Sequence, residues 1–263
     1  MGKVRERMIP DERMSAFWLK QHIGRYVFAA QFANGTVLDI ACGNGYGSSY
    51  LIHKSAKTVV GCDYSEEAIE YARLHYSKDG PSFLRLDAQQ MPFRNNSFDV
   101  IVSLETIEHL ERYQDFLQDC KRMLKEDGTF ICSTPNRKAT FGSRDPYHFR
   151  EFSVDELHEL IARYFAEIKL YGQDFLRRSD ILRRELLWRL TPIIHSIPGS
   201  IQIPLRRLLF PENYLVSLAE IDIDSKGAFH EILEEKYIPR LLTQSYPLPG
   251  TVVAVSRKRR GSG

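Results

Sequence analysis

Two carboxylates and an imidazole stand close together at Glu105, Glu108 and His109, directly after an apolar run. A helix beginning here would place all three side chains on one face, because residues at i, i+3 and i+4 are neighbours on a helix. A second imidazole, His148, follows in residues 145–150. Carboxylates and imidazoles together suit a divalent ion, either Mg²⁺ or Mn²⁺, and also Fe²⁺ or Zn²⁺. These four residues are therefore candidate metal ligands.

Without a metal ion the same residues allow acid–base chemistry. His109 or His148 would act as the general base, since imidazole titrates near neutral pH, and Glu108 completes the candidate catalytic set. Two structural interpretations stay open. Acidic residues in the first turn of a helix also complement the helix dipole, and His148 could be a loop histidine that only bonds the backbone.

A glycine-rich turn is the second chemical feature, in residues 37–47. It follows a short apolar strand that contains one carboxylate, Asp39, and a helix is expected to begin near Tyr46. The turn carries three glycines: Gly43, Gly45 and Gly47. Glycine lets the backbone approach a ligand, and the helix N-terminus adds a positive dipole end. A dinucleotide site requires its third glycine at position 48, which is Ser48, so the turn predicts a different nucleotide cofactor.

Each of the next apolar runs ends in residues that could contact such a cofactor. The runs are 57–62, followed by Asp63 and Tyr64; 82–86, followed by Asp87 and Ala88; and 97–103, which ends at Ser103. Asp63 lies twenty residues after Gly43, the spacing at which a carboxylate accepts hydrogen bonds from the hydroxyls of a ribose. Tyr64 could lie along an adenine ring.

The order of these motifs resembles that of the class I S-adenosylmethionine (SAM)-dependent methyltransferases, in particular the type 11 and ubiquinone-pathway O-methyltransferases. The resemblance implies SAM as cofactor, with Asp39 facing its amino-acid head, Asp63 its ribose and Asp87 its adenine. The implied cofactor-binding residues are Asp39, Ala41, Gly43, Gly45, Asp63, Tyr64, Asp87, Ala88 and Ser103. The Glu-x-x-Glu-His spacing, with His148, is partly similar to the metal site of the small-RNA terminal 2′-O-methyltransferases.

Short apolar strands alternate with amphipathic helices, which predicts parallel βαβ units and an α/β fold with a doubly wound sheet. The clearest helices are expected at 66–76, at 113–125, closed by Gly128, and at 154–164, capped by Ser153. The resemblance implies a Rossmann-like sheet of seven strands, mostly parallel, with an antiparallel last strand near 251–255 and a helical insertion before it.

Three parts are expected along the chain: an N-terminal helical cap at 1–33, a SAM-binding core at 34–172 and 248–260, and a basic helical insertion at 173–247. The insertion could be a substrate lid that binds an anionic group, or an interface with a membrane surface or with a second copy in a homodimer. A solvated helix face is the alternative. Candidate substrate contacts are Tyr147, Arg150, Arg183 and Arg184.

The composition of the chain limits the kinds of partner and cellular environment that we expect. The net charge of +2 is too small to argue for a nucleic-acid partner. The four cysteines have no paired spacing and fall mostly in apolar runs, which predicts buried reduced thiols. No signal peptide and no apolar run of bilayer length is seen in the sequence, so we expect a cytoplasmic location.

The leading hypothesis is a SAM-dependent methyltransferase that methylates a hydroxyl of a small metabolite, a sugar or a lipid-linked intermediate, with a divalent metal or a histidine assisting. Both forms of assistance favour oxygen as the acceptor, because an alcohol must lose its proton as the new bond forms. Two alternatives stay open: an RNA-terminus 2′-O-methyltransferase and a SAM-binding protein without catalysis. An NAD-dependent oxidoreductase is disfavoured by Ser48.

Overall fold

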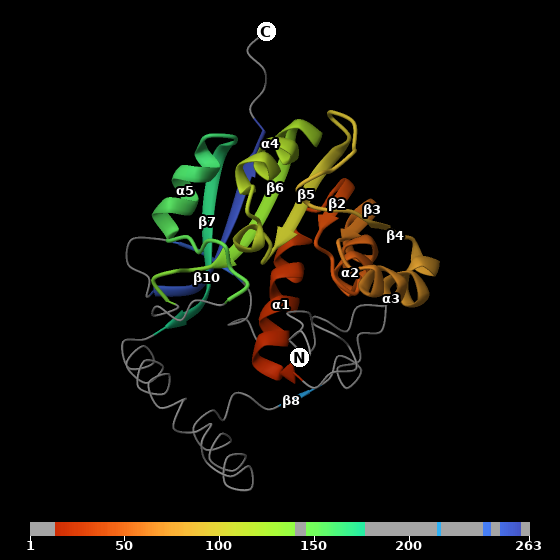
Figure 1. The fold of residues 1–263 in the computed structure, drawn as a ribbon, viewed down its shortest axis with the longest axis horizontal. Helices are drawn as coiled ribbons and strands as arrows, with labels where there is room; N and C mark the ends of the chain where they lie inside the picture. The colour runs from red at the N-terminus through yellow and green to blue at the C-terminus, as the bar shows by residue number, and fades with distance from the viewer. Residues whose placement is uncertain (1–13, 140–145, 177–214, 217–238, 243–247, 259–263) are drawn as a thin grey trace, which may run out of the picture.

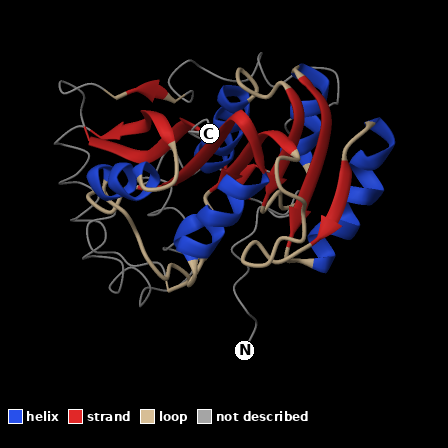
Figure 2. Cartoon of the chain, turned by 90° about the horizontal axis from the view of Figure 1, so that it is seen from above, coloured by secondary structure: helices blue, strands red, loops and turns tan. Residues whose placement is uncertain are grey.

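The computed structural model describes residues 14–139, 146–176, 215–216, 239–242 and 248–258. They form an eight-stranded mixed sheet with helices on both of its faces (Figures 1 and 2). Its strands are β2 (Gly35–Ile40), β3 (Ala56–Asp63), β4 (Ser82–Arg85), β5 (Phe98–Leu104), β6 (Leu124–Pro135), β7 (Ala166–Leu176), β9 (Arg240–Leu241) and β10 (Leu248–Arg257). A separate antiparallel pair joins β1 (Met14–Ser15) to β8 (Leu215–Val216).

Five α-helices lie within the described ranges, together with two short 3-10 turns. The α-helices are α1 (Ala16–Ala29), α2 (Tyr46–Lys54), α3 (Glu66–Tyr76), α4 (Tyr113–Met123) and α5 (Val154–Ala162). The 3-10 turns are η1 (Ser77–Asp79) and η2 (Ile107–His109). The second of these turns begins shortly after the end of β5 and contains two of the candidate metal ligands, Glu108 and His109.

The chain reverses its direction of travel across the sheet at β2. The strand order is β4-β3-β2-β5-β6-β10-β7-β9, so the chain moves outward from β2 and then returns to its other side. Neighbours from β4 to β6 are parallel, whereas β10 is antiparallel to β6 and β7. The predicted Rossmann-like sheet with an antiparallel last strand is confirmed, and β9 adds a short edge strand. In such sheets ligands bind at the carboxyl ends of the strands beside the reversal, here β2 and β5.

The central strands contribute side chains to an apolar core on each face of the sheet. Leu38 and Ile101 pack in one core with residues of α4 and α5. Val37 and Val102 pack in the opposite core with residues of α1 and α2. Successive side chains of a strand point to opposite faces, so burial on both faces requires the nearly continuous apolar runs seen in the sequence.

The end predicted for the second helix, and its glycine cap, are wrong. The helix expected at 113–125 ends at Met123, because Leu124 is extended and pairs with Phe98 of β5. Leu124 is buried, so strand pairing and core packing outweigh its helix propensity. Gly128 consequently lies inside β6 and does not cap the helix.

The cap predicted for α5 is confirmed. Ser153 Oγ accepts a hydrogen bond from the Glu156 amide, and the Glu156 carboxylate accepts one from the Ser153 amide, which completes a capping box. The helix ends at Ala162, two residues before the predicted end. The third predicted helix, 66–76, has the bounds of α3. Helix starts with a side-chain cap are therefore the elements that the sequence locates best.

Most of the predicted insertion at 173–247 lies outside the described residues, including Arg183 and Arg184. Its first residues, 173–176, continue β7, which pairs with β10 as far as Leu176. The core strand therefore extends four residues beyond the predicted boundary at residue 172.

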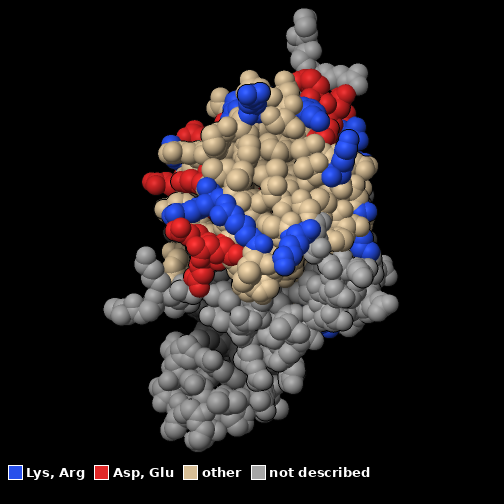
Figure 3. Space-filling model, turned by 90° about the vertical axis from the view of Figure 1, so that its right-hand side faces the viewer, with Lys and Arg blue, Asp and Glu red and all other residues tan. Residues whose placement is uncertain are grey.

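One edge of the sheet is formed by β4, which has only four residues. Viewed from this side, the surface is uncharged over much of its middle, and charged side chains lie mainly around it (Figure 3). Leu74 of α3 and Leu84 of β4 are exposed here, and Arg85 pairs with Glu66 at 3.0 Å. A short strand with charged neighbours limits edge-to-edge pairing with other chains.

Two further predictions concern the environment of the protein. All four cysteines are buried and unpaired, as predicted. No helix among the described residues has the length and apolar character needed to cross a membrane. The cytoplasmic location stays a prediction.

Helix α1 packs on the start of α2 through one glycine. A Cβ atom at Gly47 would lie 2.0 Å from the ring of Tyr26. The neighbouring rings of His22 and Tyr46 also meet, and the histidine Nδ1 hydrogen-bonds the Tyr46 hydroxyl. The third glycine of the turn is therefore required by helix packing and not by the approach of a ligand.

Replacement of Gly47 by alanine should destabilise the fold, because the added methyl group overlaps Tyr26. We expect a loss of about 1–3 kcal/mol in the free energy of unfolding, measured by urea denaturation. The variant Tyr26→Leu provides a second background in which the overlap is relieved, so Gly47→Ala should cost less there. Equal costs in the two backgrounds would contradict the contact.

Candidate functional site

The turn between β2 and α2 leaves its backbone open to a ligand at one glycine. Ala41, Gly43 and Gly45 have left-handed φ angles of 57°, 55° and 84°. A Cβ atom at Gly45 would approach Ala72 of α3 to 2.6 Å, so packing requires this glycine. A Cβ atom at Gly43 would meet nothing within 4 Å. The Gly43 backbone therefore borders open space beyond the end of β2, where a ligand can approach.

The carboxylate predicted to bind a ribose lies beside this turn. Asp63, at the end of β3, accepts a hydrogen bond from the Gly43 amide at 2.9 Å and another from the Ser65 amide at 2.8 Å. Tyr64 is 67% exposed, so its ring is available to a ligand. The structure thus brings Asp63 and Gly43 together and fixes the carboxylate by backbone donors.

The remaining predicted cofactor residues lie at the ends of β4 and β5. Asp87 and Ala88 follow β4 and are half-buried, and Asp87 Oδ1 accepts from the Gln89 amide at 2.8 Å. Ser103 is fully buried near the end of β5, and its hydroxyl has no hydrogen-bond partner. All of these residues therefore lie at the carboxyl edge of the parallel strands.

Asp39 is enclosed by the protein. Its carboxylate accepts hydrogen bonds from Ser48 Oγ at 2.6 Å and from the Tyr26 hydroxyl at 3.2 Å. The residue has no exposed surface, and burial raises the pKa of its carboxyl from 3.8 to about 7. In the structure its partners are therefore hydroxyls of α1 and α2, beneath the glycine turn.

The chain does not continue β5 into an α-helix at Glu105. This residue has a φ of 50°, its amide donates to the Ser133 carbonyl, and its carboxylate accepts from Ser133 Oγ at 2.7 Å. Only the 3-10 turn η2 follows. The predicted helix face is therefore wrong, and Glu105 is not part of the group formed by Glu108 and the two histidines.

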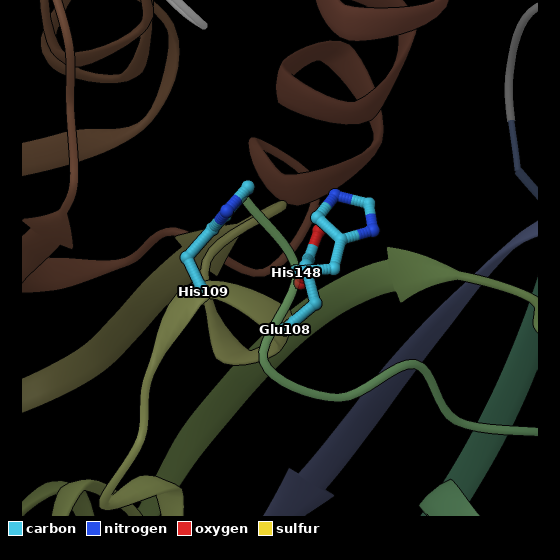
Figure 4. A group of neighbouring side chains, drawn as sticks. All are labelled: Glu108, His109 and His148. Atoms are coloured by element: carbon cyan, nitrogen blue, oxygen red, sulfur yellow. The ribbon is translucent and has the colours of Figure 1, made fainter. Parts of the chain in front are cut away.

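Three of the four predicted metal ligands converge (Figure 4). Glu108, His109 and His148 each offer one ligand atom, and these atoms all lie within 4.8 Å of one another. His148 Nδ1 lies 3.0 Å from Glu151 Oε1, and His109 Nδ1 lies 3.2 Å from the Tyr147 carbonyl. Such bonds at one ring nitrogen orient the imidazole, as second-shell partners do in metal sites.

Glu108 is the most unusual member of this group. Its side chain has no exposed surface, and neither carboxylate oxygen has a hydrogen-bond partner. Burial, reinforced by the neighbouring charge of Glu105, holds the pKa of Glu108 well above its usual value. A carboxyl group in this setting is either protonated or neutralised by a cation, so the donor set fits a divalent ion.

The loop that carries His148 is tied to the turn that carries Glu108. The Arg150 amide donates to the Glu108 carbonyl at 3.2 Å. The Arg150 guanidinium lies over the rings of Tyr113 and Phe152 and donates to the Tyr113 hydroxyl at 2.7 Å. Arg150, predicted to contact substrate, thus anchors this loop in the structure, whereas the side chain of Tyr147 is exposed.

Unpartnered polar atoms gather in this region. Seven buried side-chain polar atoms of the described residues lack a hydrogen-bond partner, and six come from α1, η2 and the ends of β5 and β6. These six are Gln21 Oε1, Arg25 Nε, Ser103 Oγ, both oxygens of Glu108 and Thr134 Oγ1. Buried polar groups without partners are costly, so their concentration here indicates a site for a polar ligand.

Two of these residues, Gln21 and Arg25, were not among the predicted site residues. Their signal in the sequence is weak: they are polar residues at i and i+4 in a largely apolar helix. The structure buries both beside Gln173 of β7, which is 148 residues from Arg25 along the chain. No local pattern could have identified that contact.

The raised pKa of Asp39 should make stability depend on pH. The folded protein retains a proton that the unfolded chain releases, so the stabilising contribution is complete below pH 3.8 and is lost as the pH rises towards about 7. Relative to Asp39→Asn, the wild-type free energy of unfolding should fall by up to about 1.4 kcal/mol per pH unit across this window. Urea denaturation at a series of pH values measures the difference.

The exposed residue Asp115 supplies the control for that experiment. Asp115→Asn also removes one carboxylate, but it leaves the buried site intact. Its stability should follow the wild-type pH profile in this range. Parallel profiles for wild type and Asp39→Asn would contradict the raised pKa.

Comparisons with known proteins agree with this arrangement. Residues 38–132 match the family model described as a methyltransferase domain. A probable SAM-dependent methyltransferase of Mycobacterium tuberculosis is 34% identical over 173 residues, which cover 64% of this chain and 62% of that protein. The ubiquinone biosynthesis O-methyltransferase of Agrobacterium fabrum is 30% identical over 168 residues, which cover 59% of this chain and 67% of that protein.

A solved structure shows the same fold. It is the complex between the Trm112 methyltransferase activator and a putative methyltransferase of Haloferax volcanii, with a TM-score of 0.58 and 19% identity over 93% of this chain and 92% of that one. The aligned region spans less than two thirds of the M. tuberculosis relative, at 62% of its length. The chain belongs to the class I SAM-dependent methyltransferases, a family of enzymes.

Proposed function

We propose that this protein transfers the methyl group of SAM to a hydroxyl oxygen of a small-molecule acceptor, assisted by a divalent ion at Glu108, His109 and His148. The observation that carries the proposal is the buried, unpartnered carboxyl of Glu108 beside two imidazoles, close to the end of β5. This end adjoins the strand that leads into the glycine turn. Donor and acceptor sites would therefore share one edge of the sheet.

The proposed binding of SAM is supported by Asp63 and by the open backbone at Gly43. Each Asp63 oxygen accepts one backbone amide, which holds the carboxylate in place for the two hydroxyls of a ribose. When bound, SAM supplies a methyl group on a positively charged sulfur. The protein then has to align an acceptor lone pair with that methyl group and remove a proton.

The proposed role of the divalent ion follows from the chemistry of a hydroxyl acceptor. A divalent ion would lower the pKa of a hydroxyl and so favour loss of its proton at neutral pH. Glu108, His109 and His148 would hold the ion, and Glu151 would orient His148. If no ion takes part, His109 or His148 is the base. Either route favours an oxygen acceptor, as in the Agrobacterium relative, which is named an O-methyltransferase.

The acceptor class we favour is a small metabolite, a sugar or a lipid-linked intermediate. The net charge of +2 gives little attraction for a nucleic-acid backbone. The exposed Tyr147 and Phe149 near His148 offer apolar surface beside the polar donors. Such a combination suits an acceptor with a ring or chain next to its hydroxyl.

Transfer of label from methyl-labelled SAM tests this function. We expect label in hydroxyl-bearing sugars or lipid-linked intermediates, as methyl ethers that survive mild alkali. Release of the label by mild alkali would show methyl esters and contradict the hydroxyl acceptor. Label in RNA termini would favour the 2′-O-methyltransferase alternative, and absence of transfer to any of these pools, despite cofactor binding, would favour the non-catalytic one.

The proposed metal site can be tested without an acceptor. Titration with Mn²⁺, followed by calorimetry, should detect one bound ion, and Glu108→Gln should weaken its affinity at least about tenfold because a charged ligand is lost. Glu111→Gln removes an exposed carboxylate three residues away and serves as the control. Equal affinities for wild type and Glu108→Gln would overturn the assignment and leave a histidine as the base.

A further inference from the structure

We propose that the ion site formed by Glu108, His109 and His148 selects a transition-metal ion of the series Fe²⁺, Co²⁺ and Zn²⁺ over Mg²⁺, and that the two imidazoles determine this selectivity. The inference rests on the proposed function, which assigns a divalent ion to these residues. It adds the chemical class of that ion, which the convergence of the three side chains alone leaves open.

The donor set of this site contains more nitrogen than oxygen donors. Among the residues that the structure describes, the group consists of one carboxylate and two imidazoles, whose ligand atoms lie within 4.8 Å of one another (Figure 4). Mg²⁺ binds oxygen ligands, whereas imidazole suits iron, nickel, copper and zinc. Two histidines and one carboxylate are also the protein ligands of many non-haem iron sites. The composition of the site therefore favours a transition ion.

Both imidazoles are held in a tautomer that can bind a metal ion. His148 Nδ1 lies 3.0 Å from Glu151 Oε1. His109 Nδ1 lies 3.2 Å from the Tyr147 carbonyl oxygen. Carboxylate and carbonyl oxygens accept hydrogen bonds, so we assign the ring hydrogen of each histidine to Nδ1. The lone pair of each neutral ring is then on Nε2, one of the two ring atoms with which histidine binds metals.

The two imidazole rings come from different segments and lie against each other. Their centroids are 4.8 Å apart, and their planes are inclined at 72°. His109 belongs to η2, and the loop that carries His148 is joined to the same turn by the bond from the Arg150 amide to the Glu108 carbonyl. Two protonated rings at this separation would repel each other. Neutral rings that bind one shared cation avoid this repulsion.

A second carboxylate, which would suit Mg²⁺, is held outside the site. Glu105 Oε1 accepts a hydrogen bond from Ser133 Oγ at 2.7 Å, and the Glu105 amide donates to the same hydroxyl at 3.0 Å. The φ angle of Glu105 is 50°, and the residue does not belong to the group of converging ligand atoms. Mg²⁺ would therefore find one protein ligand of its preferred kind, whereas a transition ion would find three.

The class of the ion bears on the proposed reaction. Water bound to aqueous Zn²⁺ has a pKa of about 9, far below that of free water. When bound, an ion of this class would likewise favour loss of the proton of an acceptor hydroxyl. The task of the chain is then to hold the ion through Glu108 and to keep both imidazoles oriented through Glu151 and the Tyr147 carbonyl.

Competition between ions tests this selectivity without an acceptor. The full chain, freed of metal by a chelator, is titrated calorimetrically with Co²⁺, Zn²⁺ and Mg²⁺. We expect Co²⁺ and Zn²⁺ to bind at least about a hundredfold more tightly than Mg²⁺, because imidazole nitrogen is a poor ligand for Mg²⁺. Pulsed electron paramagnetic resonance of bound Mn²⁺, used as a probe, should detect coupling to two imidazole nitrogens.

His148→Asp replaces one imidazole by a second carboxylate. This variant should bind Co²⁺ at least about tenfold more weakly than the wild type and should show a smaller ratio of Co²⁺ to Mg²⁺ affinity. The Mn²⁺ spectrum should retain coupling to one nitrogen only. His158→Asp makes the same replacement at an exposed position of α5, outside the group of ligand atoms, and should leave the affinities and the spectrum unchanged.

The possible outcomes separate this inference from the proposed function. If Mg²⁺ binds as tightly as Co²⁺, or if bound Mn²⁺ shows no coupling to nitrogen, the selectivity is overturned, whereas a divalent ion at Glu108 is still supported. If none of the ions binds, the proposed metal site fails as well. An unchanged ratio of affinities in His148→Asp would overturn the role of the imidazoles. Thermal melting checks folding, and His109→Asp replaces His148→Asp if the latter does not fold.

Discussion

The buried carboxylate of Asp39 links three segments that also share an apolar core, and it adds directional contacts to that packing. It belongs to β2, and it accepts hydrogen bonds from Tyr26 of α1 and Ser48 of α2. A carboxylate buried away from water needs hydrogen-bond donors. The bond from Tyr26 therefore helps to fix the position of α1 over the glycine turn. Gly47 allows the helix to approach closely enough to make the contact. Together with the apolar packing of α1, this contact places the helix beside the glycine turn.

Features with a local cause could be predicted from the sequence. The strands are apolar because they are buried on both faces, and α3 begins after Ser65, whose side chain caps its first turn. The turn at Gly43 and the carboxylate of Asp63 have a characteristic spacing, so they could be identified as neighbours before the fold was known. These local signals account for the sheet and for the side of it on which ligands are expected.

Features that depend on distant contacts could not be predicted. The helix expected at Glu105 is absent because that residue turns into a left-handed conformation and bonds to Ser133, 28 residues later. Glu108 and His148 converge where the Arg150 amide donates to the Glu108 carbonyl, a contact between segments that are far apart in the sequence. In each case the sequence identified residues of a suitable chemical type. Tertiary hydrogen bonds determined which of these residues lie together in the fold.

The buried state of Glu108 has a consequence for how this chain can vary. A neutral amide of similar shape at this position would avoid the cost of ionising a carboxyl group in the interior, so stability alone favours its replacement. Under the proposed function, a glutamate at this position costs some stability of the fold and supplies a metal ligand, a trade that functional sites commonly make. If that function holds, a change from glutamate to glutamine at position 108 would leave a more stable chain that still binds the cofactor but lacks the metal ligand, whereas the same change at a solvent-facing carboxylate would alter neither property.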